Sequence, residues 1–302
     1  MTHLEWGYKI WMEMWLGGMA AGAFFSAFLF ERFSGDNSKR LLRLATLVSI
    51  PLVAVTLLLA LLDLGKPLWF WHLFYYPPNG FTFRPVSPLW IGVWVLQIFV
   101  GLNTIMAILY LVESRKGEGE SGSLRRVIGI LSWINVVVAG VLMSYTGTLI
   151  ASTNNQLWTA GPLLPPIFVA TGVVSGLALL IVIALAYRGS WKVQSQIADR
   201  LAGAIPIVVV ILLVLLGAQF YLVNGSDMEG AALQLQVLYK GSLAIPFWAM
   251  VGAFLVSIVT LITTRGKEIE AKAIRNSILL SSVSLLAASL VLRAVIVVGG
   301  QV

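Results

Sequence analysis

The chain has 302 residues, of which 59% are hydrophobic and 11% are charged. A soluble domain of this length could not keep that much apolar surface away from water, so this class is excluded. The net charge of +7 would suit a nucleic-acid-binding protein. However, the basic residues are confined to short loops, which favours membrane topology and contact with anionic lipid. We therefore expect contact with a lipid bilayer and none with nucleic acid.

Eight apolar segments follow one another along the chain. Each has about the 20 residues that a helix needs to cross a hydrocarbon core roughly 30 Å thick. They lie at residues 10–33, 41–62, 89–112, 127–150, 164–187, 201–223, 242–263 and 277–298. The sequence therefore predicts an all-α integral membrane protein, with a single transmembrane domain over residues 1–302 and eight spanning helices.

Lys and Arg are distributed unevenly between the two sets of loops. The loops after the first, third, fifth and seventh segments hold 15 of them, and the opposite face holds 4. Because basic loops stay in the cytoplasm, both termini are predicted to be extracytoplasmic. The longest outer connection, residues 63–88, is densely aromatic. This composition is typical of an interfacial belt and is also compatible with a docking surface for a peripheral partner.

Side chains that could hold a metal-based electron carrier are scarce. The chain has no cysteine and therefore no Cys-ligated iron–sulfur cluster. It has two histidines, His3 and His72, and neither lies within an apolar segment. A bis-histidine haem needs pairs of axial ligands on facing helices at membrane depth. We therefore expect neither haem nor an iron–sulfur cluster in this chain.

Polar residues at membrane depth are costly, which makes them candidate functional residues. Because odd segments run inward and even segments run outward, Glu13, Asp63, Tyr145 and Arg293 fall at a similar depth near the outer face. Tyr145 and Arg293 could instead extend to the interface, and Asp63 could cap a helix end. Glu13 has tryptophan and methionine neighbours and little access to water. Glu13 could therefore take or give a proton, and either Glu13 or Asp63 could act as a general base.

Small residues follow Glu13 in the first segment. Gly18 and Gly22 are four residues apart, and Gly17 and Ala21 lie beside them. This spacing lets another helix approach the backbone closely. Next to a buried carboxyl group, it also lets a flat ligand lie against the helix. Both interpretations are open, and the second makes Gly17, Gly18 and Ala21 candidate ligand-binding residues.

Several motifs occur in a fixed order along the first half of the chain. They are the segment from Glu13 to Gly22, Asp-Leu-Gly-Lys-Pro at 63–67 followed by Trp-Phe-Trp-His-Leu at 69–73, Ser-Pro at 87–88 leading into Trp-Ile-Gly-Val-Trp at 90–94, and Ser-Tyr-Thr-Gly at 144–147. In this order they resemble the polysulfide reductase membrane-subunit family (NrfD/PsrC type). Residues 11–163 resemble it by motif, and the later helices resemble it by topology.

The resemblance implies a quinone-interacting membrane anchor of a molybdopterin oxidoreductase, in the inner membrane of a prokaryotic cell. It also implies two four-helix bundles without haem. The subunit would pass electrons between the quinone pool, with menaquinone expected, and an iron–sulfur subunit. It would exchange protons at the outer face, where the iron–sulfur and molybdopterin subunits would dock. Such a subunit is not an enzyme by itself.

The resemblance also suggests roles for particular residues. Tyr145 matches the family's quinone-associated tyrosine, and Asp63 and His72 match the motif beside the site. Glu13 stands where some relatives have a histidine, so the proton acceptor would differ from theirs. Independently of the resemblance, Arg293 at the same depth would balance a buried carboxylate or contact the quinone headgroup. We expect the quinone ring to pack on the glycine face of the first helix, between Tyr145 and Glu13.

Two other classes of function are compatible with the sequence. A secondary transporter could use buried Glu and Arg residues, although such proteins favour midplane sites at broken helices and inverted repeats. A purely structural membrane anchor would need the aromatic connection but not the polar residues at depth. Solute uptake by proteoliposomes would support the transporter, and binding of a quinone analogue would exclude the structural anchor.

Overall fold

The computed structural model describes residues 6–34, 39–76, 80–81, 87–115, 122–153, 155–186, 191–228, 230–265 and 272–301. The long helices in these ranges are α1 (Tyr8–Ser34), α2 (Lys39–Asp63), α3 (Pro88–Arg115), α4 (Gly122–Ala151), α6 (Leu164–Ala186), α7 (Trp191–Asn224), α9 (Ala244–Thr264) and α10 (Lys272–Gly299). Each contains a stretch long and apolar enough to cross a membrane. The prediction of an all-α integral membrane protein with eight spanning helices is confirmed.

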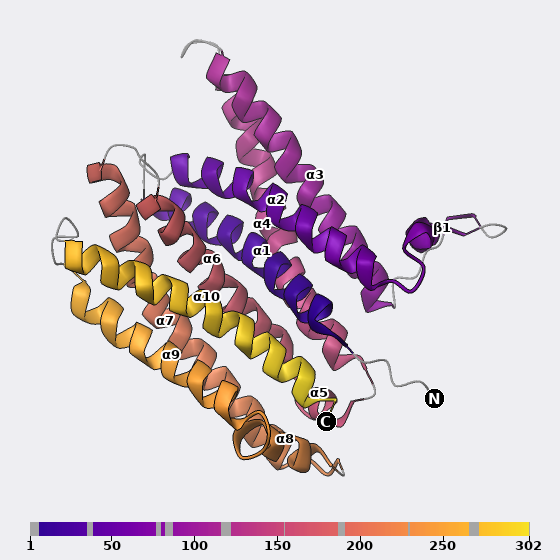
Figure 1. Ribbon diagram of the computed structural model, residues 1–302. Coiled ribbons are helices and arrows are strands. Elements are labelled where there is room, and N and C mark those ends of the chain that lie inside the picture. The colour runs from indigo at the N-terminus through magenta and orange to yellow at the C-terminus, as the bar shows by residue number, and fades with distance from the viewer. Residues whose placement is uncertain are drawn as a thin grey trace.

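Short elements connect the long helices at one end of the molecule. They are the 3-10 helix η2 (Pro67–Leu73), the antiparallel strands β1 (Tyr75–Tyr76) and β2 (Gly80–Phe81), and the helices α5 (Gln156–Thr159) and α8 (Ala231–Tyr239). The start of α1 and the end of α10 lie at this same end (Figure 1). The pattern of long apolar segments gives no indication of these elements, because none of them is long enough to cross a bilayer.

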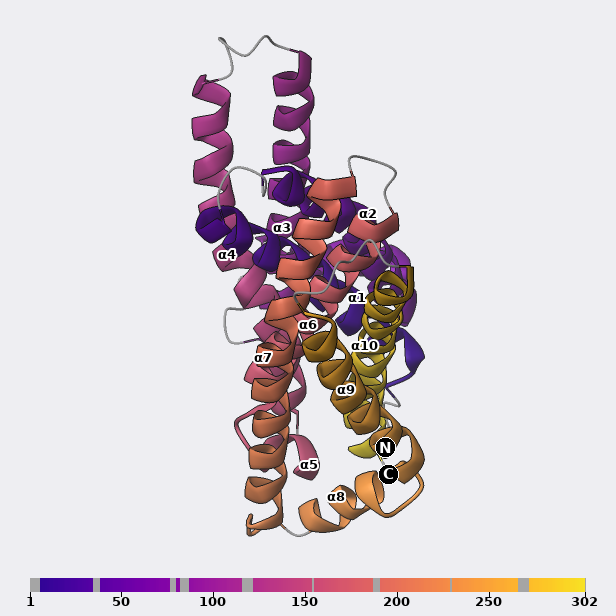
Figure 2. The same ribbon diagram turned by 90° about the vertical axis from the view of Figure 1, so that its left-hand side faces the viewer.

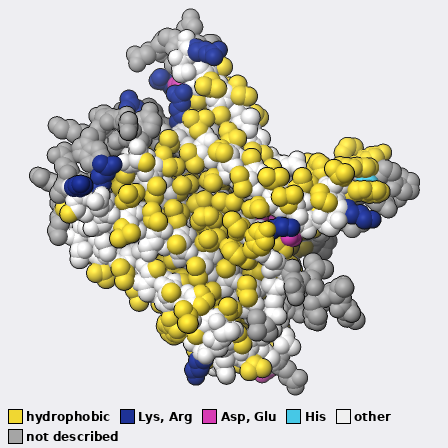
Figure 3. Space-filling model, viewed as in Figure 1, with side chains coloured by type: hydrophobic (Ala, Val, Ile, Leu, Met, Phe, Trp, Pro, Cys, Tyr) yellow, Lys and Arg dark blue, Asp and Glu magenta, His cyan; other side chains and the backbone are white. Residues whose placement is uncertain are grey.

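The opposite end of the molecule is basic. There α3 and α4 extend past the other helices (Figure 2). On the face shown in Figure 3, most Lys and Arg side chains lie at this end, and the broad middle is hydrophobic. A hydrophobic middle suits contact with lipid chains. The orientation of the two ends across the membrane stays a prediction.

Helices α1 and α6 pack against each other in the middle of the molecule. Helix α1 also contacts α2, α4 and α10, and α6 also contacts α4, α7 and α10. Glycines make the central contact close: a Cβ atom at Gly22 would overlap the backbone carbonyl of Gly172. Similarly, a Cβ atom at Gly176 would overlap the backbone of Gly22 and Ala23. This is the packing that small residues at helical spacing allow.

The grouping of the helices follows from these contacts. Helices α1 to α4 contact one another in sequence, and α6, α7, α9 and α10 do the same. The contact between α1 and α6 is nevertheless as extensive as most contacts within either group. The division into two four-helix bundles therefore stays a prediction, and the central helix pair joins the two groups.

Candidate functional site

A cavity of about 590 Å³ lies between α1, α2, α3 and α4, at the end of the molecule where α1 begins. Phe70, Leu73 and Phe74, in and next to η2, form part of its wall. Its volume and its mainly apolar lining are typical of a site for a small organic molecule. The polar residues that line it are Glu13, Thr56, Asp63, Gln97, Tyr145 and Thr146.

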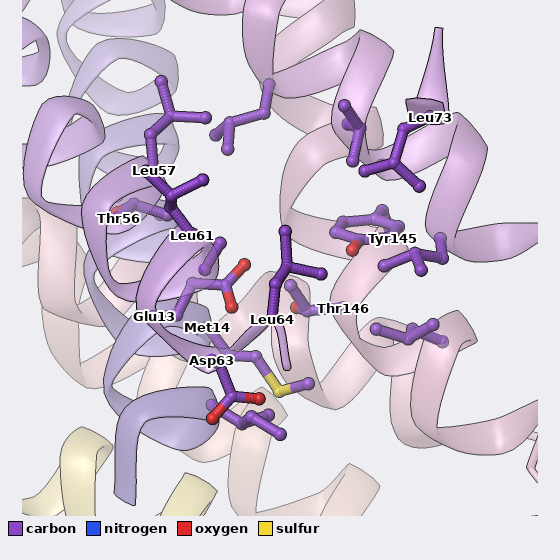
Figure 4. A pocket seen from close by; sticks show the side chains of 18 of the residues that line it. Glu13, Met14, Thr56, Leu57, Leu61, Asp63, Leu64, Leu73, Tyr145 and Thr146 are labelled. Atoms are coloured by element: carbon purple, nitrogen blue, oxygen red, sulfur yellow. The ribbon is translucent and has the colours of Figure 1, made fainter. Parts of the chain in front are cut away.

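Glu13 reaches the cavity from α1, on the helix face that also carries Ile10, Met14 and Gly17. Its carboxyl group points into the cavity (Figure 4). No hydrogen bond or ion pair joins it to another residue in the part of the chain that the structure describes. Asp63 lies near enough for the two charges to interact. A carboxyl group held this way is free to accept a proton from a ligand.

Tyr145 reaches the cavity from α4, on the side facing Glu13. Its ring packs against the backbone of Gly92 on α3, where any Cβ atom would overlap it. The hydroxyl group points toward the middle of the cavity (Figure 4). A phenol can both donate and accept a hydrogen bond. A ligand lying between Glu13 and Tyr145 would therefore meet one hydrogen-bonding group on each side.

Another part of the wall comes from α1 and α2. At Gly17 a Cβ atom would lie 3.3 Å from Cγ2 of Thr56, so the absent side chain keeps this wall flat. Asp63, the last residue of α2, is exposed. Beside it, Nζ of Lys9 donates a hydrogen bond to the carbonyl oxygen of Leu62 over 3.0 Å. Asp63 therefore both lines the cavity and is exposed at the surface.

The other predicted site residues do not line the cavity. A Cβ atom at Gly18 would meet the guanidinium group of Arg293, and Ala21 is fully buried. Successive helix residues point about 100° apart, so Gly17 faces the cavity while Gly18 faces the neighbouring helices. His72 is half-buried in η2, with its ring centroid 4.7 Å from that of Trp69 and 3.9 Å from that of Trp71.

Arg293, on α10, also lies behind the cavity wall and is only 1% exposed. Its Nη1 donates to Oγ1 of Thr146 over 3.4 Å. Its Nη2 donates to the carbonyl oxygen of Phe168 over 3.2 Å and to Oγ1 of Thr171 over 3.4 Å. Among the described residues it forms no ion pair with a carboxylate. The structure therefore brings Glu13, Gly17, Asp63 and Tyr145 together and leaves Gly18, Ala21, His72 and Arg293 outside the lining.

Some lining residues were not identified as candidates from the sequence. Thr146 follows Tyr145 in the Ser-Tyr-Thr-Gly motif, so the motif itself could have indicated it. Thr56 lies seven residues before Asp63, two helical turns away on the same face of α2. The family resemblance placed the motif at 69–73 beside the site, but composition did not indicate that Phe70 and Leu73 line the cavity, because the aromatic residues suit an interfacial belt equally well.

The whole chain, residues 1–302, matches the family model described as "Polysulphide reductase, NrfD". The sequence is 26% identical to a component of the polysulfide reductase of Wolinella succinogenes, with 98% of this protein and 94% of the relative covered. It is 27% identical to an NrfD homolog of Haemophilus influenzae, and the match covers 99% of this protein and 95% of the relative. It is 25% identical to a selenate reductase subunit of Mesobacillus selenatarsenatis, and the match covers 89% of this protein and 69% of the relative. The resemblance seen in the motifs is confirmed, and the chain belongs to the NrfD polysulphide reductase family of multi-pass membrane proteins.

Proposed function

We propose that this protein is the quinone-binding membrane anchor of a molybdopterin oxidoreductase complex. In this role it passes electrons between the quinone pool and an iron–sulfur partner subunit. The observation that carries the proposal is the cavity between α1 and α4, where Glu13 and Tyr145 face each other across the apolar lining. Two relatives are named as components of a reductase, which supports a place in a complex of several subunits.

The cavity fits a quinone ring by shape and by chemistry. A quinone has a flat, apolar ring with one oxygen on each of two opposite edges. The wall at Gly17 is flat, and most of the lining is apolar. Glu13 and Tyr145 stand on opposite sides, where they could each meet one ring oxygen (Figure 4). With its volume of about 590 Å³, the cavity can also hold the first part of an isoprenoid chain.

A bound quinol supplies two electrons and two protons. The residues of this chain would bind it and manage the protons. The Tyr145 hydroxyl group would hydrogen-bond one ring oxygen, and the Glu13 carboxylate would accept the two protons one after the other. Asp63, which is exposed and also lines the cavity, would pass each proton to the outer surface before the next is taken up. The apolar lining would keep bulk water away from the ring.

The partners would dock at the end of the molecule that holds the cavity. The proposed membrane is the inner membrane of a prokaryotic cell, with both termini outside and menaquinone as the quinone. On η2, Leu68 is 87% exposed and Trp69 is 58% exposed, next to the cavity wall. An iron–sulfur subunit seated on this end would bring its cluster near Glu13 and Tyr145. The molybdopterin subunit would attach to that partner.

Binding of a quinol analogue tests the proposal. A hydroxyquinoline N-oxide would be titrated into the purified protein, comparing wild type with Glu13→Gln and Tyr145→Phe. Glu13→Gln removes the ionisable carboxyl group and Tyr145→Phe removes a hydroxyl group, so each should weaken saturable binding about 10-fold. Glu113→Gln and Tyr221→Phe are matched controls, because Glu113 pairs with Arg125 and Tyr221 is 82% exposed, both away from the cavity. Absence of saturable binding to an intact complex would overturn the assignment.

A further inference from the structure

Arg293 is a cation in the interior of the protein at a point where four helices meet. It lies on α10, and its guanidinium group bonds to Thr146 on α4 and to Thr171 on α6. The same group lies against Gly18 on α1, where no Cβ atom would fit beside it. Its Cζ atom is 4.5 Å from the ring centroid of Phe168. The proposed function gives this residue no role.

The surroundings of Arg293 are electrically neutral. Its hydrogen-bond partners are two hydroxyl groups and one backbone carbonyl, and an aromatic ring covers one face. No carboxylate forms an ion pair with it in the described ranges. Its Nε atom is buried without a hydrogen-bond partner in those same ranges. A buried cation without a counter-charge is costly, so a negative charge bound nearby would offset much of that cost.

The nearest place for such a charge is the cavity. Thr146, whose Oγ1 accepts the bond from Nη1 of Arg293 over 3.4 Å, lines the cavity with its own side chain. The same hydroxyl group donates to the carbonyl oxygen of Met143 over 3.3 Å. The guanidinium group therefore lies one side chain behind the cavity wall. Protein rather than water separates the two, so the charge is only weakly screened there.

The ionisable groups on the other walls of the cavity are acidic, so they disfavour an anionic ligand. Glu13 and Asp63 both line the cavity and carry negative charge when ionised. An anionic ligand would be repelled by them, and a cation on the far side would offset that repulsion. Arg293 is the buried cation placed to do so among the described residues that contact the lining.

We propose that Arg293 gives the Thr146 wall of the cavity a positive potential, so that the site holds a ligand with a negatively charged ring oxygen more tightly than its neutral counterpart. This inference rests on the proposed quinone function and adds an electrostatic preference to that site. Arg293 acts from behind the wall and is a positioning residue. Gly18 is part of the device, because its missing side chain gives the guanidinium group its place.

A matched pair of ligands tests this preference. One is a 3-alkyl-2-hydroxy-1,4-naphthoquinone, whose hydroxyl group is ionised at neutral pH, and the other is its neutral 2-methoxy analogue. The ratio of their dissociation constants would be measured for the purified complex. In Arg293→Gln the anion should lose about 10-fold in affinity relative to the neutral ligand, the effect of one charge at moderate distance. Arg293→Lys should retain most of the wild-type ratio.

The control removes a cation from the same helix. Arg275, whose Nη2 donates to the carbonyl oxygen of Leu185 over 2.8 Å, lies near the opposite end of α10. Arg275→Gln should leave the ratio unchanged, since the lost charge lies far from the cavity. If Arg293 only clamps α10 to α4 and α6, Arg293→Gln would weaken both ligands equally or neither. Either result would overturn the inference.

Two further results need to be distinguished: failure of Arg293→Gln to fold, and absence of binding by the wild type. If Arg293→Gln does not fold, Gly18→Ala serves instead, because the added methyl group overlaps the guanidinium group and must displace it. In Gly18→Ala the affinity for the anionic ligand relative to the neutral ligand should also fall below the wild-type value. An unchanged relative affinity would contradict the inference. If wild type binds neither naphthoquinone, the proposed quinone function itself has failed. That outcome differs from retained binding of both ligands with no preference for the anion.

Discussion

The first four spanning helices and the last four differ in how they treat buried polar groups. In the described part of α1, α3 and α4, buried polar atoms of Ser26, Trp94, Asn103 and Asn135 have no hydrogen-bond partner. In the described part of α6, α7, α9 and α10, Nε of Arg293 is the one buried side-chain polar atom without a partner, and the buried hydroxyl groups mostly bond to carbonyls of their own helix. Examples are Ser175 with Thr171, Ser282 with Ile278, and Ser289 with Leu286.

We interpret α1 to α4 as the half that holds the ligand site, and α6, α7, α9 and α10 as the half that supports it. An unpartnered buried polar group costs free energy, although none of these four side chains lines the cavity. The cavity and the facing pair Glu13 and Tyr145 lie in the first half. The second half supports them, because α6 contacts α1 closely through Gly172 and Gly176. Apart from Arg293, whose charge acts on the cavity from α10, we expect substitutions in the first half to affect ligand chemistry and substitutions at the contact between the halves to affect stability.

The largest expected effect comes from Glu13→Gln in the first half. Loss of a general base lowers a proton-coupled rate by about 100-fold or more. Quinol oxidation by the intact complex should fall by this amount, while assembly of the complex stays normal. Glu113→Gln, the same change in an exposed ion pair at the basic end, should leave the rate unaltered. Equal rates for Glu13→Gln and wild type would exclude Glu13 as the proton acceptor.

The contact between the halves should respond to Gly22→Ala. The new methyl group overlaps the carbonyl group of Gly172, so α1 and α6 must move apart. We expect a loss of about 1–3 kcal/mol in the free energy of unfolding, the usual cost of overpacking. Gly217→Ala on α7 is the matched control, because nothing lies within 4 Å of its Cβ position. Thermal unfolding in detergent compares the two, and equal stability would argue against the close contact.

A smaller effect is expected from Tyr145→Phe. The ring still packs against Gly92, and only the hydroxyl group is lost. One hydrogen bond contributes about 1 kcal/mol, so quinol turnover should fall roughly 5- to 10-fold. The amount of assembled complex, measured by gel filtration, should stay the same. Loss of assembly instead would show that the role of Tyr145 is structural.

The smallest effect is expected in the supporting half. The hydroxyl group of Ser282 bonds to the carbonyl oxygen of Ile278, which already serves the helix ladder. Ser282→Ala removes both the hydroxyl group and its need for a partner. We expect turnover unchanged and stability altered by less than about 0.5 kcal/mol. A strong effect on turnover would mean that the second half also takes part in the chemistry.

The sequence predicted the long helices and part of the site for a simple physical reason. Spanning length and alternating direction fix both the number of helices and the depth of each residue. The positions of Glu13 and Tyr145 along their helices predicted that they lie at the same membrane depth. In the structure they lie on facing walls of the cavity (Figure 4). Depth does not determine rotation about a helix axis. Gly18, Ala21 and Arg293 were therefore expected beside the ligand but lie behind the cavity wall.

The wall formed by η2 was predicted only in part: the family resemblance placed the motif at 69–73 beside the site, but not the side chains that line it. Its aromatic residues suit a membrane interface, a docking surface or a cavity wall equally well. Only tertiary contact decides between these roles, and in the structure Phe70 and Leu73 line the cavity while Leu68 stays exposed. A composition rule for interfaces therefore identified the segment correctly as unusual and gave no information about which side chains turn inward.

Photolabelling with an azido-quinone would show directly whether a quinone binds in the cavity between Glu13 and Tyr145. The intact complex would be illuminated with the labelled quinone, and the modified peptides would be located by mass spectrometry. We expect label on α1 and α4 near Glu13 and Tyr145, removed by excess hydroxyquinoline N-oxide and reduced in Glu13→Gln. Label that is confined to α6, α7, α9 and α10, or that the competitor does not remove, would contradict a quinone site between Glu13 and Tyr145.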